Sequence, residues 1–358
     1  MGRARAITAI AGAAAMLGVF PMTATAGFGD EHTYWGWVVV RNPSMSSYTP
    51  AAADRGNSTG GGVQVHHLTT GRYEIKFDNL TASSYPRGGL AHVSPISSKP
   101  RICSVSNINA TGSIDLIVAV DCFNQAGMPV DSQFSLSYLA SGEQQGTLGY
   151  LRVLSPDQPN PNLDDFSSFN SANGAISLTR FAAGSYRAHF GDLQTAGGSV
   201  LVTTMYDDYA CRAGQWNGLA DEVTVDVRCY NSAGTLHDAY FMLTFMDGLG
   251  VKGFGGTSVA YLRATRPKTS SYTPPAAFRF STESGTPNVK HLAKGKYRVR
   301  LPNFETGGAA VVTAVGDGKQ RCQLEALPTA GSPKKIDVHC FTPGGGSTNS
   351  PFVLSFLQ

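Results

Sequence analysis

The chain has little charge, and the charge that it has is nearly balanced. Only 15% of its 358 residues are Asp, Glu, Lys or Arg, and the formal net charge is +3. Without the two arginines of the N-terminal segment discussed next, 26 basic residues remain against 25 acidic ones. Nucleic acids and anionic membranes attract concentrated positive charge, so this composition predicts neither as a partner.

The chain also lacks a long apolar run. A basic N-terminus is followed by an Ala-rich stretch from Ile7 to Met22, but Pro21 interrupts it before it reaches the roughly 20 residues of a membrane span. Ala24-Thr25-Ala26 fits the small-residue rule for signal cleavage. We therefore expect residues 1–26 to be a signal peptide, and not an uncleaved anchor. The mature chain, with no transmembrane segment, is expected to be secreted and either released or associated with the cell wall.

Several catalytic motifs are missing as well. The sequence contains no G-x-S-x-G, H-E-x-x-H or Walker pattern, and its eight histidines show no metal-ligand spacing. We therefore expect no cofactor and no bound metal. A triad or a carboxylate pair assembled from distant residues stays open, because such groups need only meet in space. The sequence favours a protein that is not an enzyme without excluding one.

The chain has six cysteines and no C-x-x-C pair, which in an exported protein indicates disulfides and not metal ligands. They fall into three pairs with a spacing of 19, 18 and 18 residues, and the expected bridges are Cys103–Cys122, Cys211–Cys229 and Cys322–Cys340. A loop of that length stabilises the folded state by about 3 kcal/mol in the chain-entropy model. No cysteine is left for catalysis.

The cysteine pairs belong to an internal repeat. Trp37, Tyr150 and Tyr261 are 113 and then 111 residues apart, and the same offsets relate many glycines, prolines and tyrosines. Each copy also carries a Gly-Gly pair before its first cysteine, at residues 88–89, 197–198 and 307–308. We divide the mature chain into repeat 1 (residues 27–140), repeat 2 (149–246) and repeat 3 (259–358), joined by linkers at 141–148 and 247–258.

Within each repeat the apolar residues alternate with a period of two, which is typical of strands with one buried face. The run Ile114, Leu116, Val118, Val120 before Cys122 shows this clearly. Glycines 71, 184 and 295 each lie between two such runs and predict tight hairpins that need a positive φ. About seven short strands per repeat predict an all-β protein of three tandem antiparallel β-sandwich domains, immunoglobulin-like or jelly-roll-like, with one disulfide each.

Several motifs together resemble a known repeat. They are the aromatic residue at the start of each copy, Ser47-Tyr48-Thr49-Pro50, the Gly-x-Tyr hairpin, the Gly-Gly pair and the segment from Cys122 to Asp131-Ser132-x-Phe134. This combination resembles a disulfide-bonded β-rich repeat of uncharacterised secreted proteins from high-GC Gram-positive bacteria. The resemblance implies export and a β-rich fold but no activity. Repeat 2 departs from it, with Asn160-Pro161-Asn162-Leu163 in place of Ser-Tyr-Thr-Pro.

Positions that differ between the copies are candidates for a site. Repeat 2 has Tyr206-Asp207-Asp208-Tyr209 where the others have no aromatic residue, and this loop could bind a sugar by stacking and hydrogen bonding, or bind Ca²⁺. The Asp157 to Asp165 segment has the oxygen ligands of a Ca²⁺ site but lacks the EF-hand glycine and glutamate. A solvated loop and ordinary turns are the simpler interpretations of the two segments.

A recurring basic or imidazole position is the second candidate. His67, Arg180 and His291 occupy equivalent places and could bind an anion or a glycan, or could pair with a carboxylate of the chain itself. By contrast, Trp216 aligns with apolar residues and is predicted to be core.

These observations favour a secreted, non-enzymatic binding or adhesion protein for an extracellular glycan, a cell-wall polymer or a protein. An extracellular hydrolase with a site in repeat 2 and a self-associating structural surface protein are the alternatives.

Overall fold

The computed structural model describes residues 33–81, 88–109, 114–195, 197–218, 221–253 and 255–358. The expected signal peptide, residues 1–26, lies outside these ranges. Within them the protein is all-β, as the alternating pattern predicts, and the helices are three 3₁₀ turns: η1 (Ala52–Asp54), η2 (Asp165–Ser167) and η3 (Ala276–Phe278). In these ranges no helix has both the length and the apolar character to span a membrane.

The strands follow the three repeats in order. Repeat 1 contains β1 (Thr33–Val40), β2 (Ser47–Tyr48), β3 (Arg55–Asn57), β4 (Val63–Thr69), β5 (Arg72–Phe77), β6 (Leu90–Ile96), β7 (Arg101–Asn109), β8 (Leu116–Asn124) and β9 (Gln133–Ser141). Repeat 2 contains β10 (Thr147–Arg152), β11 (Phe169–Asn170), β12 (Ile176–Ala182), β13 (Ser185–Gly191), β14 (Ser199–Thr204), β15 (Ala210–Gly218), β16 (Glu222–Tyr230) and β17 (Phe241–Asp247). Repeat 3 contains β18 (Val259–Ala264), β19 (Ser271–Tyr272), β20 (Arg279–Ser281), β21 (Asn288–Ala293), β22 (Lys296–Leu301), β23 (Ala309–Ala314), β24 (Arg321–Ala326), β25 (Lys334–Phe341) and β26 (Phe352–Leu357).

These strands form two antiparallel sheets in each repeat, as expected of a sandwich. The inner sheets have the orders β3-β1-β9-β6, β11-β10-β17-β14 and β20-β18-β26-β23. The outer sheets have the orders β2-β4-β5-β8-β7, β12-β13-β16-β15 and β19-β21-β22-β25-β24. The described strands number nine, eight and nine per repeat and not seven, because strands of two or three residues are too short to show alternation.

Apolar side chains of the two sheets pack together in the same way in every repeat. A buried tyrosine of the outer sheet contacts a buried phenylalanine of the inner sheet, at ring-centroid distances of 5.1, 5.3 and 5.2 Å for Tyr73–Phe134, Tyr186–Phe241 and Tyr297–Phe352. The hairpin glycines have the expected positive φ: 74° at Gly71, 65° at Gly184 and 76° at Gly295. The three predicted disulfides are confirmed, and each one joins directly opposite residues of neighbouring strands.

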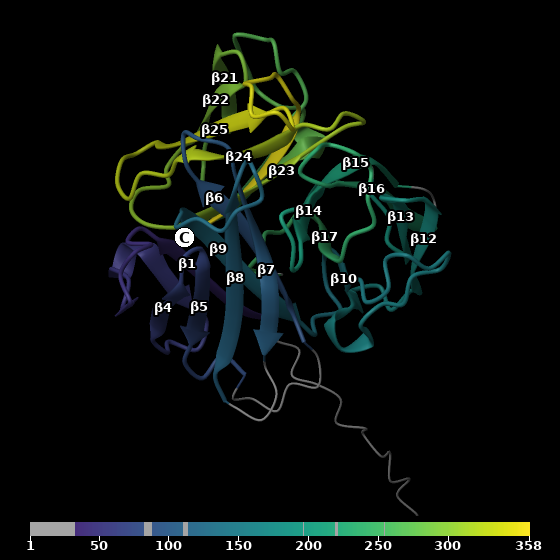
Figure 1. Ribbon diagram of the computed structural model, residues 1–358. Helices are drawn as coiled ribbons and strands as arrows, with labels where there is room; N and C mark the ends of the chain where they lie inside the picture. The colour runs from purple at the N-terminus through teal and green to yellow at the C-terminus, as the bar shows by residue number, and fades with distance from the viewer. Residues whose placement is uncertain (1–32, 82–87, 110–113, 196, 219–220, 254) are drawn as a thin grey trace, which may run out of the picture.

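The three repeats close into a ring in which each one pairs with the next (Figure 1). In each contact, the residue two positions after the first cysteine of one repeat forms a parallel bridge with the end of the innermost strand of the following repeat. The bridged pairs are Val105–Met205, Ala213–Val315 and Leu324–Ile96. A backbone hydrogen bond of 3.2, 2.9 and 2.9 Å accompanies each bridge, donated by Tyr206, Gly316 and Ser97. Repeat 3 therefore pairs with repeat 1, and its outer sheet continues into the inner sheet of repeat 1.

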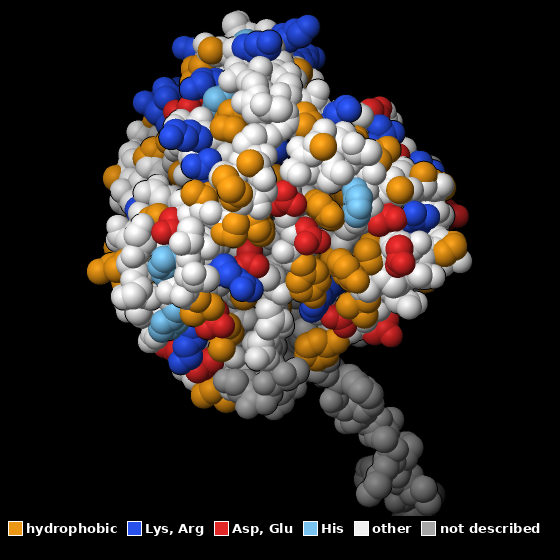
Figure 2. All heavy atoms as spheres, in the orientation of Figure 1, with side chains coloured by type: hydrophobic (Ala, Val, Ile, Leu, Met, Phe, Trp, Pro, Cys, Tyr) orange, Lys and Arg blue, Asp and Glu red, His pale blue; other side chains and the backbone are white. Residues whose placement is uncertain are grey.

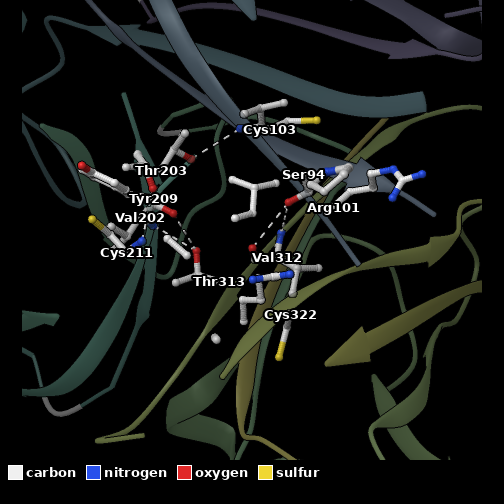
Figure 3. Close-up of a pocket in the computed structure, with 17 residues that line it drawn as sticks. Ser94, Arg101, Cys103, Val202, Thr203, Tyr209, Cys211, Val312, Thr313 and Cys322 are labelled. Atoms are coloured by element: carbon white, nitrogen blue, oxygen red, sulfur yellow. Dashed lines mark hydrogen bonds between the residues drawn. The ribbon is translucent and has the colours of Figure 1, made fainter. Parts of the chain in front are cut away.

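Hydroxyl groups join the repeats at the centre of the ring, where β6, β14 and β23 meet (Figures 1 and 3). Ser94, Thr203 and Thr313 are equivalent residues of these strands, and each hydroxyl accepts an amide N–H from another repeat. The donors are Val312 at 2.8 Å, Val93 at 3.4 Å and Val202 at 3.0 Å, respectively. Buried amides need such partners, so the hydroxyls satisfy backbone groups that the sandwiches leave open.

The Gly-Gly pairs mark a second kind of contact between repeats. The first glycine of each pair lies against the 3₁₀ turn of the next repeat: Gly88 against η2, Gly197 against η3 and Gly307 against η1. A Cβ at Gly307 would lie 2.7 Å from the carbonyl oxygen of Ala53, and one at Gly197 would overlap the carbonyl of Ala277. Glycine is therefore required there because backbone meets backbone.

The two expected linkers are packed parts of the fold. Ser141 ends β9, and its hydroxyl lies 2.8 Å from that of Thr33. In the second segment Leu249 and Val251 are buried, and the amide of Gly248 donates to the hydroxyl of Tyr261 at 3.2 Å. Each segment thus contributes to the core that the repeats share.

We predict that Gly197→Ala lowers the free energy of unfolding by about 1–3 kcal/mol, because overpacking at a rigid contact forces backbone to move. Chemical denaturation of the full chain measures this. Gly344→Ala is the control, since the nearest atom to its new Cβ would be the Thr342 hydroxyl at 3.9 Å. Equal effects of the two substitutions would contradict the role assigned to the Gly-Gly pair.

Candidate functional site

The recurring candidates His67, Arg180 and His291 each bind a side chain of their own repeat. In repeat 1, Asp131 accepts from His67 Nε2 at 2.9 Å, the Gly71 amide at 2.8 Å and the Tyr73 hydroxyl at 3.3 Å. Repeat 2 builds the same cluster around Asp238 and repeat 3 around Asn349. Two partners were expected for this position: an external anion or glycan, or a group of the chain itself. The geometry favours the partner within the chain.

The cluster in repeat 2 is the most strongly charged. Arg180 donates twice to Asp238, at 2.9 and 2.7 Å, and the Gly184 amide and the Tyr186 hydroxyl donate at 2.9 and 2.7 Å. Partial burial acts to raise the pKa of Asp238, but the hydrogen bonds from Arg180, Tyr186 and Gly184 outweigh it and lower the pKa to about 2. This arrangement ties the hairpin glycine to the segment that precedes the last strand of the repeat.

The Tyr206 to Tyr209 loop lies in the contact between repeats 1 and 2. Besides the bond from its amide to Val105, Tyr206 packs edge to face on Tyr240 at 5.3 Å, and its hydroxyl accepts from Arg152 at 3.2 Å. The ring of Tyr209 lies 4.8 Å from that of His237, tilted by 50°. Figure 2 shows carboxylate side chains at the centre of this face, where the lobes meet. The pKa of Asp207 is raised by burial and by the neighbouring Asp208.

The Tyr206 to Tyr209 loop differs from its counterparts because the residue that faces it from the preceding repeat differs. That residue is the one directly after the first cysteine. After its first cysteine, repeat 2 has Arg212, which donates to the carbonyls of Val315 and Gln320 in repeat 3. Repeat 3 has Gln323 there, which donates to the carbonyls of Ser97 and Lys99 in repeat 1. Repeat 1 has Ser104, whose side chain is too short to reach the loop of repeat 2. The loop therefore makes other contacts.

The centre of the ring contains a cavity of 60 Å³, lined by the three hydroxyls described above and by Cys103, Cys211 and Cys322 (Figure 3). Arg101 lines it as well, but Figure 3 shows its guanidinium pointing away from the centre. Burial lowers the pKa of Arg321, a further lining residue, to about 10. The cavity has room for a few water molecules only, so it is not a site for a polymer.

Trp216, predicted as core, is buried in the hydrophobic core and also contacts repeat 3. Its indole N–H donates to the Gly197 carbonyl at 3.0 Å, and the guanidinium of Arg263 lies 3.8 Å above its ring. In the Asp157 to Asp165 segment, Asp164 accepts from the Phe166 amide of η2 and pairs with Arg152 of β10. Among the described residues no three His, Cys, Asp or Glu side chains gather where a metal ion could bind.

Repeat 2 has an open sheet edge where the other repeats have an extra strand. In repeat 1, β2 pairs with β4, and in repeat 3, β19 pairs with β21. In repeat 2, β12 is the edge of the described outer sheet, and a groove of 810 Å³ lies between its residues 176–179 and the loop 160–168. The structure thus places this groove beside Asn160-Pro161-Asn162-Leu163, the segment in which repeat 2 departs from the others.

The segment of repeat 2 that begins at Pro159 makes one backbone hydrogen bond to the edge strand β12 and then turns away from it. The Arg180 amide donates to the Pro159 carbonyl at 3.1 Å, as the His67 amide donates to Ser46 at 2.9 Å in repeat 1. Proline 161 has no N–H and cannot continue a ladder. The chain turns instead toward β10, where the Asn162 carbonyl accepts from the Leu154 amide at 2.8 Å.

Repeat 3 has a basic outer sheet, which the whole-chain charge conceals. Residues 259–358 contain 13 Lys and Arg against 5 Asp and Glu, whereas residues 27–258 contain 13 against 20. Figure 2 shows Lys and Arg side chains gathered over the lobe that Figure 1 assigns to β21, β22 and β25. A count for each repeat would have found this signal in the sequence.

The basic residues of this sheet face each other across strands. Lys290 lies opposite Arg298, and Arg300 lies opposite Lys335. Arg298 is neutralised by Asp337 at 2.7 Å, but within the described part of the chain no carboxylate forms an ion pair with Lys290, Arg300 or Lys335. The equivalent residues of repeat 2 are Thr179, His189 and Thr224, so the basic face belongs to repeat 3.

We predict that Asp238→Asn lowers the free energy of unfolding at pH 7 by about 2 kcal/mol, the value of a pKa shift from 3.8 to about 2. A depressed carboxylate pKa stabilises the folded state above pH 3.8, and this contribution disappears as the pH falls through about 2. The variant should therefore show a flatter pH dependence of stability in that window, measured by urea unfolding. The exposed Asp221→Asn is the control, and an equally flat profile in that variant would contradict the assignment.

Comparison of the chain with protein-family models, with curated proteins and with solved structures finds no match. The resemblance to a secreted β-rich repeat stays a prediction. What this chain binds is therefore inferred from the chemistry of its own surface.

Proposed function

We propose that the protein is a secreted, non-enzymatic adhesion protein that binds an anionic polymer of the cell wall through the outer sheet of repeat 3. Three disulfides fit an oxidising compartment outside the cell. The expected signal peptide adds an export route, and a wall polymer is one of the partner classes that the sequence favours.

The observation that carries the proposal is the basic face of β21, β22 and β25. Like charges directly opposite each other on a sheet destabilise it by about 0.2–1 kcal/mol per pair. Arg300 and Lys335 form such a pair, and Lys290 adds an unpaired positive charge opposite Arg298, whose own charge is balanced by Asp337. The sister repeats show that the fold does not need them. A polymer with regularly spaced phosphate or carboxylate groups would neutralise the rows and offset that cost.

The geometry is also that of a polymer site. An exposed sheet face with several basic side chains suits a long charged chain that binds by many weak contacts, and the affinity then depends on salt because counterions are released. The hydrolase alternative gains no support. Asp207 and Asp208 lie in the Tyr206 to Tyr209 loop, which forms part of the contact between repeats 1 and 2.

We predict that purified residues 27–358 are depleted from solution by bacterial cell walls in a saturable way, and less so by walls stripped of anionic polymers. Raising the salt concentration should weaken the depletion because the attraction is electrostatic. Lys290→Gln with Arg300→Gln should weaken it by about tenfold and leave the melting temperature unchanged or slightly higher.

Lys99→Gln with Arg72→Gln is the control, because it removes the same charge from exposed side chains of repeat 1, one of which, Arg72, pairs with Asp121. This pair should change depletion by less than about twofold. If the two double variants lose depletion by the same factor, the binding depends on net charge alone and not on the basic face of repeat 3. Depletion that is unaffected by stripping the walls would contradict an anionic polymer as the ligand.

A further inference from the structure

We propose that the groove at the open edge of repeat 2 binds an extended segment of another protein, which adds to the outer sheet as a strand beside β12. The segment that fits has a tyrosine followed two residues later by a proline. This site is separate from the basic sheet of repeat 3 and does not depend on the function proposed for it.

The backbone of β12 presents hydrogen-bonding groups to the groove. The amide of Arg180 points to the open side, because it donates to Pro159, and the carbonyl of Ala175 points to β13, because it accepts from Gly191 at 2.8 Å. Groups alternate along a strand. Ile176 and Leu178 therefore direct their N–H and C=O groups to the open edge, which is what an added strand requires.

The sister repeats show which side chains fill this place. Tyr48 of β2 lies opposite Val65, and Tyr272 of β19 lies opposite Val289; the residue of repeat 2 that corresponds to both valines is Leu178. The tyrosine hydroxyls accept from the amides of Asn42 at 3.4 Å and Arg266 at 3.0 Å.

Two residues after each tyrosine, Pro50 and Pro274 are buried. Both repeats use the same sequence, Ser-Ser-Tyr-Thr-Pro, at 46–50 and 270–274. The groove of repeat 2 lies at the place that this segment occupies in repeats 1 and 3. A partner that binds in the groove should therefore share the chemistry of Ser-Ser-Tyr-Thr-Pro.

Charge favours a basic partner. The residues that line the groove include the carboxylate of Asp165 and no Lys or Arg, and the neighbouring Arg180 is already paired with Asp238. Repeat 2 as a whole contains ten acidic and five basic residues. The segment of repeat 3 that precedes its own tyrosine carries Arg266 and Lys268, so its sequence is complementary to the groove as well as correct in shape.

A protein strand explains the groove better than the other partners. A glycan would use the hydroxyl and amide groups but would leave the row of backbone groups on β12 unpaired. A second copy of this chain would pair β12 with β12, but the loop 160–168 stands on the far side of the groove and limits the space to a single strand.

The test uses a fluorescent synthetic peptide with the sequence of residues 266–275, Arg-Pro-Lys-Thr-Ser-Ser-Tyr-Thr-Pro-Pro. Its anisotropy should rise saturably with the full mature chain, and a peptide with Ala in place of Tyr should bind at least about tenfold more weakly. Amide exchange measured by NMR should slow at Ile176 and Leu178 when the peptide is added. The amides of Val65 and Val289, already paired within their repeats, should not change.

The matched variant gives repeat 2 the segment of repeat 1 through Pro159→Ser, Asn160→Ser, Pro161→Tyr, Asn162→Thr and Leu163→Pro. It should fill the groove from within and lower peptide affinity by at least about tenfold, because a tethered segment competes at high effective concentration. Its wall depletion should stay that of the wild type. Ser177→Arg, which places a long side chain on the groove wall, gives the same result without rebuilding the loop, and Gln64→Arg at the equivalent place in repeat 1 is its control.

Three results would overturn the proposal. The first is no binding of the peptide to the wild type up to about 1 mM, the weak end of specific association. The second is equal binding by the wild type, the variant with the rebuilt loop and Ser177→Arg. The third is a concentration-dependent dimer, without peptide, that the rebuilt loop abolishes, which would assign the groove to a second copy of this chain.

Discussion

The structure depends on backbone groups that each repeat leaves open for the next. The carbonyls of Val105, Ala213 and Leu324 each accept an amide from the following repeat, and the hydroxyls of Ser94, Thr203 and Thr313 cap amides at the centre. In an open row of three sandwiches the first and last members would leave these groups without a protein partner and would expose the apolar surface beside them to water. The ring removes both ends because repeat 3 returns to repeat 1.

This closure divides the residues of each repeat into two classes. Many positions that serve the ring or the sandwich are alike in all copies, as in the Gly-Gly contacts and the Tyr–Phe pairs, although the residue after the first cysteine and the loop that it faces differ. Two further differences fall on the outer sheets: the basic face of repeat 3 and the open edge of repeat 2. A rigid ring with distinct outer surfaces can hold two partners at a fixed separation, which suits an adhesion protein.

Local patterns predicted the local structure well. The period of two in β8 and β16 identified strands, the paired spacing identified three disulfides, and the hairpin glycines were correctly given a positive φ. Contacts between repeats were not predicted. The Gly-Gly pair was visible as a recurrent motif, but its cause lies in a 3₁₀ turn that is remote in sequence. The tyrosines of the Tyr206 to Tyr209 loop, interpreted as a sugar platform, are in contact with Tyr240 and His237 of the same repeat. Charge was averaged over the chain, which hid the opposite signs of repeats 2 and 3.

The sequence by itself determined the all-β fold, the sandwich of each repeat and the cysteine pairing, because alternation and spacing act between residues that are close along the chain. The tertiary structure alone decided that the repeats form a ring, that the recurring His67, Arg180 and His291 are held by their own repeats, and that repeat 2 has an open edge. These features depend on contacts between residues that are far apart along the chain. The partners in the ring contacts lie in another repeat, and those of His67, Arg180 and His291 lie 64, 58 and 58 residues further on, so a local pattern does not reveal them.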